Sequence, residues 1–269
     1  MVGMPKTPRP WAASVASRRA SLISGSWVAF STSSGSKPAL REGGIISPVR
    51  DLQLVIFDCD GVLVDSEVIS NSVLARLLTT DGLPTTLAEA RRDYQGLLLG
   101  EVFDRAQEKL GRSLPNDWLV RFESERAEAF HRELRPVPGA AEVVERVCAA
   151  GVAVCVASQG KLEKTRLSLD ITGLRRLFPE PALFSAYSVA LGKPHPDLFL
   201  HAAAEIGADP ARCVVVEDTP SGVMAGVSAG MRVFGYTADS DEHALRQAGA
   251  VTFRSLDELP TLLGLPGFG

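Results

Sequence analysis

Short apolar runs alternate with amphipathic stretches along most of the chain, beginning near Leu52. The apolar runs have the length of buried strands, and the stretches between them have helical spacing. Strands are expected at 52–57, 152–157, 182–184, 213–217 and 231–236, and helices between them at 139–150, 160–168, 196–206 and 219–229. This order predicts an α/β fold, a Rossmann-like, doubly wound parallel sheet with helices on both faces.

One interval, from Asp65 to Pro138, has helical periodicity but no strand pattern. About seventy residues are too many for an ordinary connection between two strands. We therefore expect an all-helical cap at 67–136, inserted into an α/β core formed by 48–66 and 137–269. The linkers 64–66 and 135–139 are the expected hinges of cap movement.

The first 47 residues show neither strand nor helical periodicity, and they contain nine Ser up to position 36. Positions 1–41 carry six basic and no acidic residues. Organellar targeting segments and unstructured extensions share this composition, so we expect a disordered or targeting-like extension.

Composition narrows the class of protein further. The 22 basic and 32 acidic residues after position 41 give a net charge of −10, which argues against nucleic acid as the main partner. No apolar run is long enough to span a bilayer. The four cysteines form no C-x-x-C pair and are expected to be buried, reduced thiols. We expect a cytoplasmic monomer.

Negative charge is concentrated where the first strand ends, in VIFDCDGVLVDSE at 55–67. Because strand side chains alternate, Asp58 and Asp60 should lie on one side, with Cys59 turned away. Open parallel sheets bind ligands outside the carboxyl ends of their strands. Two carboxylates placed there repel each other unless a cation is bound, and a hard divalent ion such as Mg²⁺ fits oxygen ligands best.

Three other polar groups follow predicted strands or precede a helix of the same sheet. Glu217 and Asp218 come directly after CVVV. Ser158 ends VCVAS, where its hydroxyl and the N–H groups of the next helix could hold an anion, or where it could simply cap that helix. Lys193 in LGKPHPDLF is either a solvated loop charge or the cation that an anionic substrate needs.

These motifs, taken in order, resemble the haloacid dehalogenase superfamily, in the branch with a helical cap inserted after the first strand. The matching segments are DCDGVLVDSE, Ser158 in VASQG, GKPHPDLF and VVVEDTPSGVMAG, within a resemblance that covers 52–250. The resemblance implies that Asp58 is a nucleophile that forms an aspartyl-phosphate. Asp60 would act as general acid to the leaving oxygen and then as general base to water.

The resemblance also implies the groups that bind phosphate and metal. Ser158 and Lys193 would hold the transferring phosphoryl oxygens. Mg²⁺ would be bound by Asp58, Asp60 through its backbone carbonyl, and Asp218, with Glu217 as a further ligand or a partner of the ligands. We also expect Asp58 and the substrate phosphate to raise the pKa of Asp60.

An acid at position 60 favours phosphate chemistry, because dehalogenases of this fold lack one two residues after the nucleophile. A hexose-phosphate mutase resembling β-phosphoglucomutase is the competing enzyme, and its cap loop has basic residues around a Gly. The loop DYQGLLLGE lacks them, which favours a phosphatase acting on a small phosphorylated metabolite: a sugar, polyol or sugar-acid phosphate. A catalytically silent binding module is the alternative from another class.

Substrate selection is assigned to residues near the cap. The candidate substrate-binding residues are Gln95, Gly96, Gln159 and Lys161. Several cap arginines could contact substrate or lie on solvated helix faces, namely Arg91, Arg92, Arg105 and Arg121. Asp65 and Glu67 either border the site or complement the dipole of the first cap helix.

Overall fold

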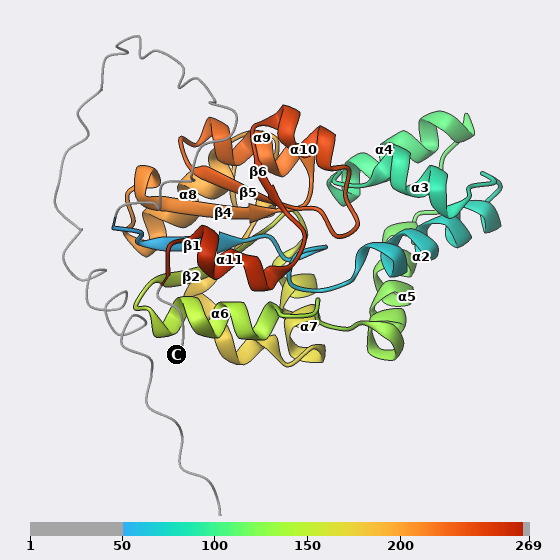
Figure 1. Cartoon of the computed structure of the whole chain (residues 1–269). Coiled ribbons are helices and arrows are strands. Elements are labelled where there is room, and N and C mark those ends of the chain that lie inside the picture. Colours follow the sequence, from blue (N-terminus) through green and yellow to red (C-terminus); the bar gives the residue numbers. More distant parts are fainter. Residues whose placement is uncertain (1–50, 266–269) are drawn as a thin grey trace, which may run out of the picture.

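A single parallel sheet organises the chain (Figure 1). The structure, a computed structural model, describes residues 51–265; the expectation for 1–47 lies outside this range. The sheet has six strands in the order β3-β2-β1-β4-β5-β6. Their bounds are β1 Leu54–Phe57, β2 Ala153–Ser158, β3 Leu183–Ser185, β4 Cys213–Glu217, β5 Arg232–Tyr236 and β6 Val251–Phe253.

Alternating side chains of the strands supply two separate apolar layers. Val55 and Phe57 of β1 belong to one buried cluster, whereas Leu54 and Ile56 belong to the other. Helices cover both faces, with α6, α7 and α11 on one side and α8, α9 and α10 on the other (Figure 1). Their bounds are α6 Ala140–Ala149, α7 Leu162–Ile171, α8 Asp197–Ile206, α9 Pro220–Ser228, α10 Glu242–Ala248 and α11 Leu259–Leu262. The predicted α/β, doubly wound fold is confirmed.

Four helices lie between β1 and α6, at one end of the sheet (Figure 1). They are α2 Glu67–Thr80, α3 Leu87–Tyr94, α4 Leu99–Leu110 and α5 Trp118–Glu133. Their apolar faces pack on each other, and the rings of Phe103 in α4 and Trp118 in α5 lie with centroids 5.9 Å apart. No strand forms among residues 67–133, as the periodicity predicts. The proposed limits of core and cap stay a prediction.

The two linkers that join these helices to the sheet run side by side. Val64 forms an isolated antiparallel bridge with Pro136, and the backbone N–H of Asp65 donates to the carbonyl of Arg135 at 3.0 Å. A second bond joins the N–H of Val137 to the carbonyl of Leu63, also at 3.0 Å. Entry and exit of the helical insertion are therefore held together by backbone hydrogen bonds.

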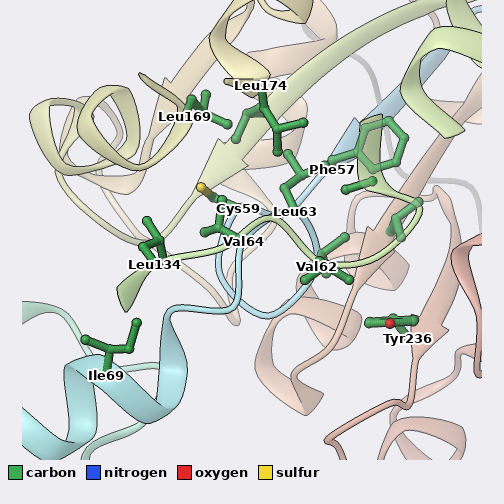
Figure 2. Packing of buried hydrophobic residues seen from close by; sticks show 14 of the residues in the cluster. Phe57, Cys59, Val62, Leu63, Val64, Ile69, Leu134, Leu169, Leu174 and Tyr236 are labelled. Carbon is green, nitrogen blue, oxygen red and sulfur yellow. The ribbon is translucent and has the colours of Figure 1, made fainter. Parts of the chain in front are cut away.

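Buried side chains fix the loop that leaves β1. Figure 2 shows Cys59, Leu63 and Val64 among residues from the linkers and from α7, with Ile69 and Leu134 beside them. Cys59 is fully buried there, as expected for a side chain turned away from Asp58 and Asp60. This packing orients the two acidic residues toward the end of the sheet.

The strand and the α-helix that follow α10 in the chain are not predicted by the apolar pattern. The short strand β6 pairs in parallel with β5, and α11 follows it. The sequence of β6, Val251-Thr252-Phe253, has a polar residue at the centre, so there is no apolar run to indicate a strand. All four cysteines are free; Cys59, Cys155 and Cys213 are buried as expected, whereas Cys148 is half-buried. Between residues 51 and 265, no helix combines the length and apolarity needed to cross a bilayer.

Candidate active site

Three ionisable side chains meet at the carboxyl ends of β1 and β4. The ammonium of Lys193 forms ion pairs with the carboxylate of Asp58 and, at 2.6 Å, with Oε1 of Glu217. It also donates to the carbonyl of Ala157 in β2, at 3.1 Å. All three side chains are almost fully buried. Lys193 therefore joins the ends of three neighbouring strands, β2, β1 and β4.

Burial and mutual repulsion set the charges of this cluster. Burial raises the pKa of Asp58 to about 7, with Glu217 and Asp60 adding to the rise and Lys193 opposing it. Burial disfavours the charge of Lys193, but Asp58 and Glu217 outweigh that effect and raise its pKa. Lys193 is therefore positively charged near neutral pH, and its charge stabilises the ionised form of Asp58.

Glu217 is held by the start of the following helix. Its Oε2 accepts from the backbone N–H groups of Asp218 and Thr219 at 3.0 and 2.9 Å, and from the Thr219 hydroxyl at 2.8 Å. A β-carbon at Gly222, in the first turn of α9, would overlap this carboxylate. The sequence EDTPSG thus fixes Glu217 as a partner of Lys193, with both oxygens in use.

Asp218 differs from its neighbour because one of its oxygens has no partner. Its Oδ1 is buried and accepts no hydrogen bond. Gly61, at φ +77°, lies so close that a β-carbon there would overlap the Asp218 carboxylate. Burial raises the pKa of Asp218 well above its usual range, and the charges of Glu217 and Asp58 raise it further.

Asp60 is engaged by a residue that the sequence motifs do not indicate. Its carboxylate forms an ion pair with Lys164 of α7 and accepts from the hydroxyls of Ser66 and, at 3.5 Å, Ser158. Burial would raise the pKa of Asp60, but Lys164 and Ser66 outweigh it and hold the pKa below its usual range. The expectation of a raised pKa is therefore wrong for this structure, because a buried lysine compensates the charge.

Ser158 lies at the end of β2, where the polypeptide turns into α7. Its hydroxyl accepts from the N–H of Gly160 at 3.0 Å, so it caps the turn as well as contacting Asp60. The side chain of Gln159 accepts from the N–H of Lys193 at 3.0 Å. The ends of β1, β2 and β4 and the loop before α8 are thus brought to one place.

A cavity of about 150 Å³ opens from this cluster toward helices α2 to α5. Asp58, Asp60, Lys193 and Glu217 line its floor. The four candidate substrate-binding residues all line it, namely Gln95, Gly96, Gln159 and Lys161. Glu67 also lines it as the first residue of α2, so it both borders the site and begins a helix. The roles assigned to these residues stay predictions.

The four arginines considered from the sequence do not line this cavity. Arg92 and Arg121 pair with Asp93 and Asp81, and Arg105 donates to a backbone carbonyl. Two other basic residues line the wall, Lys164 and Arg126, and no sequence motif indicates either of them.

A hard cation fits the acidic end of this site. Asp58, Glu217 and Asp218 place three buried carboxylates around one buried ammonium, and the unpartnered Oδ1 of Asp218 is a free oxygen ligand. In the described part of the chain, no three His, Cys, Asp or Glu side chains converge closely enough to hold a metal ion by themselves. The ligand set of Asp58, Asp60, Asp218 and Glu217 stays a prediction.

Comparison with known proteins agrees with this arrangement. The family model for haloacid dehalogenase-like hydrolases matches residues 52–230, from the start of the β1 region to the end of α9. The chain belongs to this family. The recognition made from the four motifs is confirmed, and so is the expectation of a hydrolase.

Three known proteins resemble this chain in sequence or in structure. The 6-phosphogluconate phosphatase of Escherichia coli is 31% identical over 212 residues, which cover 78% of this chain and 94% of the relative. A solved family hydrolase from Deinococcus radiodurans, with bound phosphate and sodium, is 32% identical at a TM-score of 0.65, covering 79% of this chain and 95% of that one. A β-phosphoglucomutase-like protein of Thermotoga maritima is 28% identical at a TM-score of 0.64, covering 79% and 97%.

Proposed function

We propose that this family member is a Mg²⁺-dependent phosphatase that hydrolyses a small phosphorylated metabolite of the sugar, polyol or sugar-acid phosphate class. The observation that carries the proposal is the buried trio of Asp58, Lys193 and Glu217 at the floor of a cavity. The names of the relatives support phosphate as the group removed.

In the first step, an oxygen of Asp58 attacks the phosphorus of the substrate, and the bond from phosphorus to the leaving oxygen breaks. Asp60 gives its proton to that oxygen, so the alcohol leaves neutral. In the second step, water attacks the aspartyl-phosphate, Asp60 takes a proton from the water, and the bond to Asp58 breaks to release phosphate. Asp60 must therefore leave its ion pair with Lys164 and be protonated when substrate binds.

The remaining groups bind and neutralise the phosphate. Lys193 and Ser158 would hold phosphoryl oxygens beside Asp58, which would be the main protein contribution to a reaction with a loose transition state. A bound Mg²⁺, held by Asp58 and Asp218, would neutralise charge on the transferring group. Because three buried carboxylates face one lysine, two more positive charges are needed for balance when all are ionised.

The test is release of phosphate from p-nitrophenyl phosphate with and without Mg²⁺. We expect turnover by the wild type with Mg²⁺, and a loss of at least about a thousandfold in Asp58→Asn, because the amide is not a nucleophile. Equal activity of the two proteins would sink the proposal. Absence of turnover by a folded wild type would support the silent binding module.

Hydrolysis and mutase activity are separated by a second assay. β-Glucose 1-phosphate is incubated with a trace of the 1,6-bisphosphate, and glucose 6-phosphate and free phosphate are both measured. The phosphatase proposal expects phosphate release. Isomerisation without net release of phosphate would establish the mutase instead.

A further inference from the structure

The last cap helix, α5, has a positive charge in the middle of its apolar face. Trp118, Phe122 and Phe130 are spaced by multiples of four residues and are buried, so they define the face that turns inward. Arg126 lies one turn after Phe122 and one turn before Phe130, on the same face. A guanidinium at such a position costs stability unless it serves a ligand.

Arg126 has no acceptor of its own between residues 51 and 265. Its guanidinium lies over the ring of Phe122, with Cζ 4.9 Å from the centroid. No ion pair or hydrogen bond joins it to another described side chain or backbone group. Burial lowers the pKa of Arg126, while the nearby charges of Asp60 and Glu123 oppose that change. The side chain remains a cation, and it lines the cavity that begins at Asp58 as well as a neighbouring hollow beside α7.

The other cations on the cavity wall are already paired. Lys164 pairs with Asp60, and Lys161 pairs with Glu123 at 2.7 Å. Lys193 pairs with the two carboxylates at the floor. The remaining acidic residue of the wall, Glu67, accepts from Asn71 at 3.1 Å and not from Arg126. One positive charge is therefore left over on the cap side of the cavity.

A second polar group of the same wall also lacks a partner. The hydroxyl of Tyr94, at the end of α3, is buried and makes no hydrogen bond, and the residue is only 4% exposed. A buried hydroxyl without a partner carries a desolvation cost that a hydroxylated ligand would remove. The cap wall thus offers a neutral donor and acceptor at Tyr94 and a planar cation at Arg126.

We propose that Arg126 is a specificity-determining residue that binds a carboxylate at the end of the substrate remote from the phosphate. The substrate class is then a phosphorylated sugar acid, with Tyr94 taking a hydroxyl of its carbon chain. One unpaired guanidinium matches a carboxylate of charge −1 better than a second phosphate of charge near −2. This inference rests on the proposed phosphatase function and narrows its substrate.

The test compares two substrates that differ only at one carbon. 6-Phosphogluconate ends in a carboxylate where glucitol 6-phosphate ends in a CH₂OH group. We expect wild-type kcat/KM to favour 6-phosphogluconate by at least about tenfold, and Arg126→Met to reduce this ratio by about ten- to a hundredfold. Arg126→Lys, which keeps the charge but loses the two-pronged geometry, should give an intermediate ratio.

Two variants control for indirect effects. Arg121→Met removes an arginine of the same helix that pairs with Asp81 at 3.3 Å outside the cavity, and it should leave the ratio unchanged. Tyr94→Phe should lower kcat/KM for both substrates by a similar factor, about three- to tenfold, because both carry hydroxyls. Arg126→Met should melt no lower than the wild type, since it replaces a half-buried charge by an apolar side chain.

The outcomes separate this inference from the function on which it rests. If the wild type releases phosphate from p-nitrophenyl phosphate but treats the two substrates equally, the carboxylate subsite is wrong and the phosphatase stands. An equal loss on both substrates in Arg126→Met also overturns the subsite. Preference for glucose 1,6-bisphosphate over 6-phosphogluconate would assign Arg126 to a second phosphate instead. No phosphate release from any substrate would overturn the proposed function itself.

Discussion

The floor of the cavity and its cap wall differ in whether their polar side chains are paired. At the floor, Lys193 is paired with Asp58 and Glu217, and Asp60 is paired with Lys164. On the cap wall, the guanidinium of Arg126 and the hydroxyl of Tyr94 are left without partners among the described residues. A floor whose charged side chains pair with one another is suited to one reaction on any phosphate ester. An incomplete wall is suited to recognising the rest of the molecule.

Loss of the lysine at the floor should have the largest effect. Lys193→Met leaves the carboxylates of Asp58 and Glu217 buried without their cation, which should cost about 3–5 kcal/mol of unfolding free energy. Activity should fall by at least about a hundredfold, because a donor to the transferring group is lost. Urea denaturation and kcat/KM measure the two effects.

The matched control is Lys109→Met, which breaks an exposed ion pair between Lys109 and Asp93 in the helical insertion. It should change stability little. If the two lysine variants behaved alike, the floor would not depend on internal charge pairing, and the contrast with the cap wall would disappear.

A smaller effect is expected from crowding the floor. In Gly222→Ala the new methyl group would overlap the Glu217 carboxylate and push it away from Lys193. We expect a loss of about 1–3 kcal/mol in unfolding free energy, measured by urea denaturation. Gly100→Ala in α4 has nothing within 4 Å of its new methyl group and should instead gain up to about 1 kcal/mol. A stable Gly222→Ala would mean that Glu217 can move freely.

The smallest effect concerns Glu67, at the border between floor and wall. Burial raises its pKa to about 7 from an ordinary value of 4.5, and Asp60 adds to the rise. The folded protein therefore holds this proton more tightly than the unfolded chain, and that stabilisation is lost as pH rises from 4.5 through 7. Glu67→Gln, which cannot ionise, should match the wild type near pH 4.5 and exceed it by roughly 1–2 kcal/mol at pH 8.

Melting temperatures measured across this pH range test the prediction. Glu133→Gln, at an exposed position of α5, is the control and should follow the wild type throughout. A constant difference between Glu67→Gln and the wild type at every pH would show that Glu67 is ionised equally in the folded and unfolded chains.

The sequence predicts the fold and the floor of the site because both depend on local patterns. A polar side chain directly after an apolar strand must lie at the carboxyl end of that strand. The grouping of Asp58, Glu217 and Ser158 at one end of the sheet therefore follows from the strand pattern alone. The ion pair of Asp60 with Lys164 does not follow from it, since that pair depends on how α7 docks against the loop after β1. The strand β6 is not predicted because Thr252 interrupts its apolar residues, whereas the equally short β3 lies in an apolar run.

Arg126 is a different case, because its signal is present in the sequence. An arginine spaced by four residues from both Phe122 and Phe130 interrupts an apolar stripe. The cap arginines considered from the sequence are instead Arg91, Arg92, Arg105 and Arg121, of which three are held by other cap residues. A charge on a helix face that otherwise turns inward is thus a better guide than membership of the cap alone.

The paired linkers at Val64 and Pro136 have a mechanical consequence. Two segments joined by backbone hydrogen bonds form a narrow two-stranded ribbon. Such a ribbon bends perpendicular to its plane more easily than it bends within that plane or twists. Any swing of α2 to α5 away from the sheet would then follow one arc, returning the α5 guanidinium to the same height above the phosphate on every closure. A substrate of another length would then place its far end too close to the guanidinium or too far from it, so the hinge would select substrates by length.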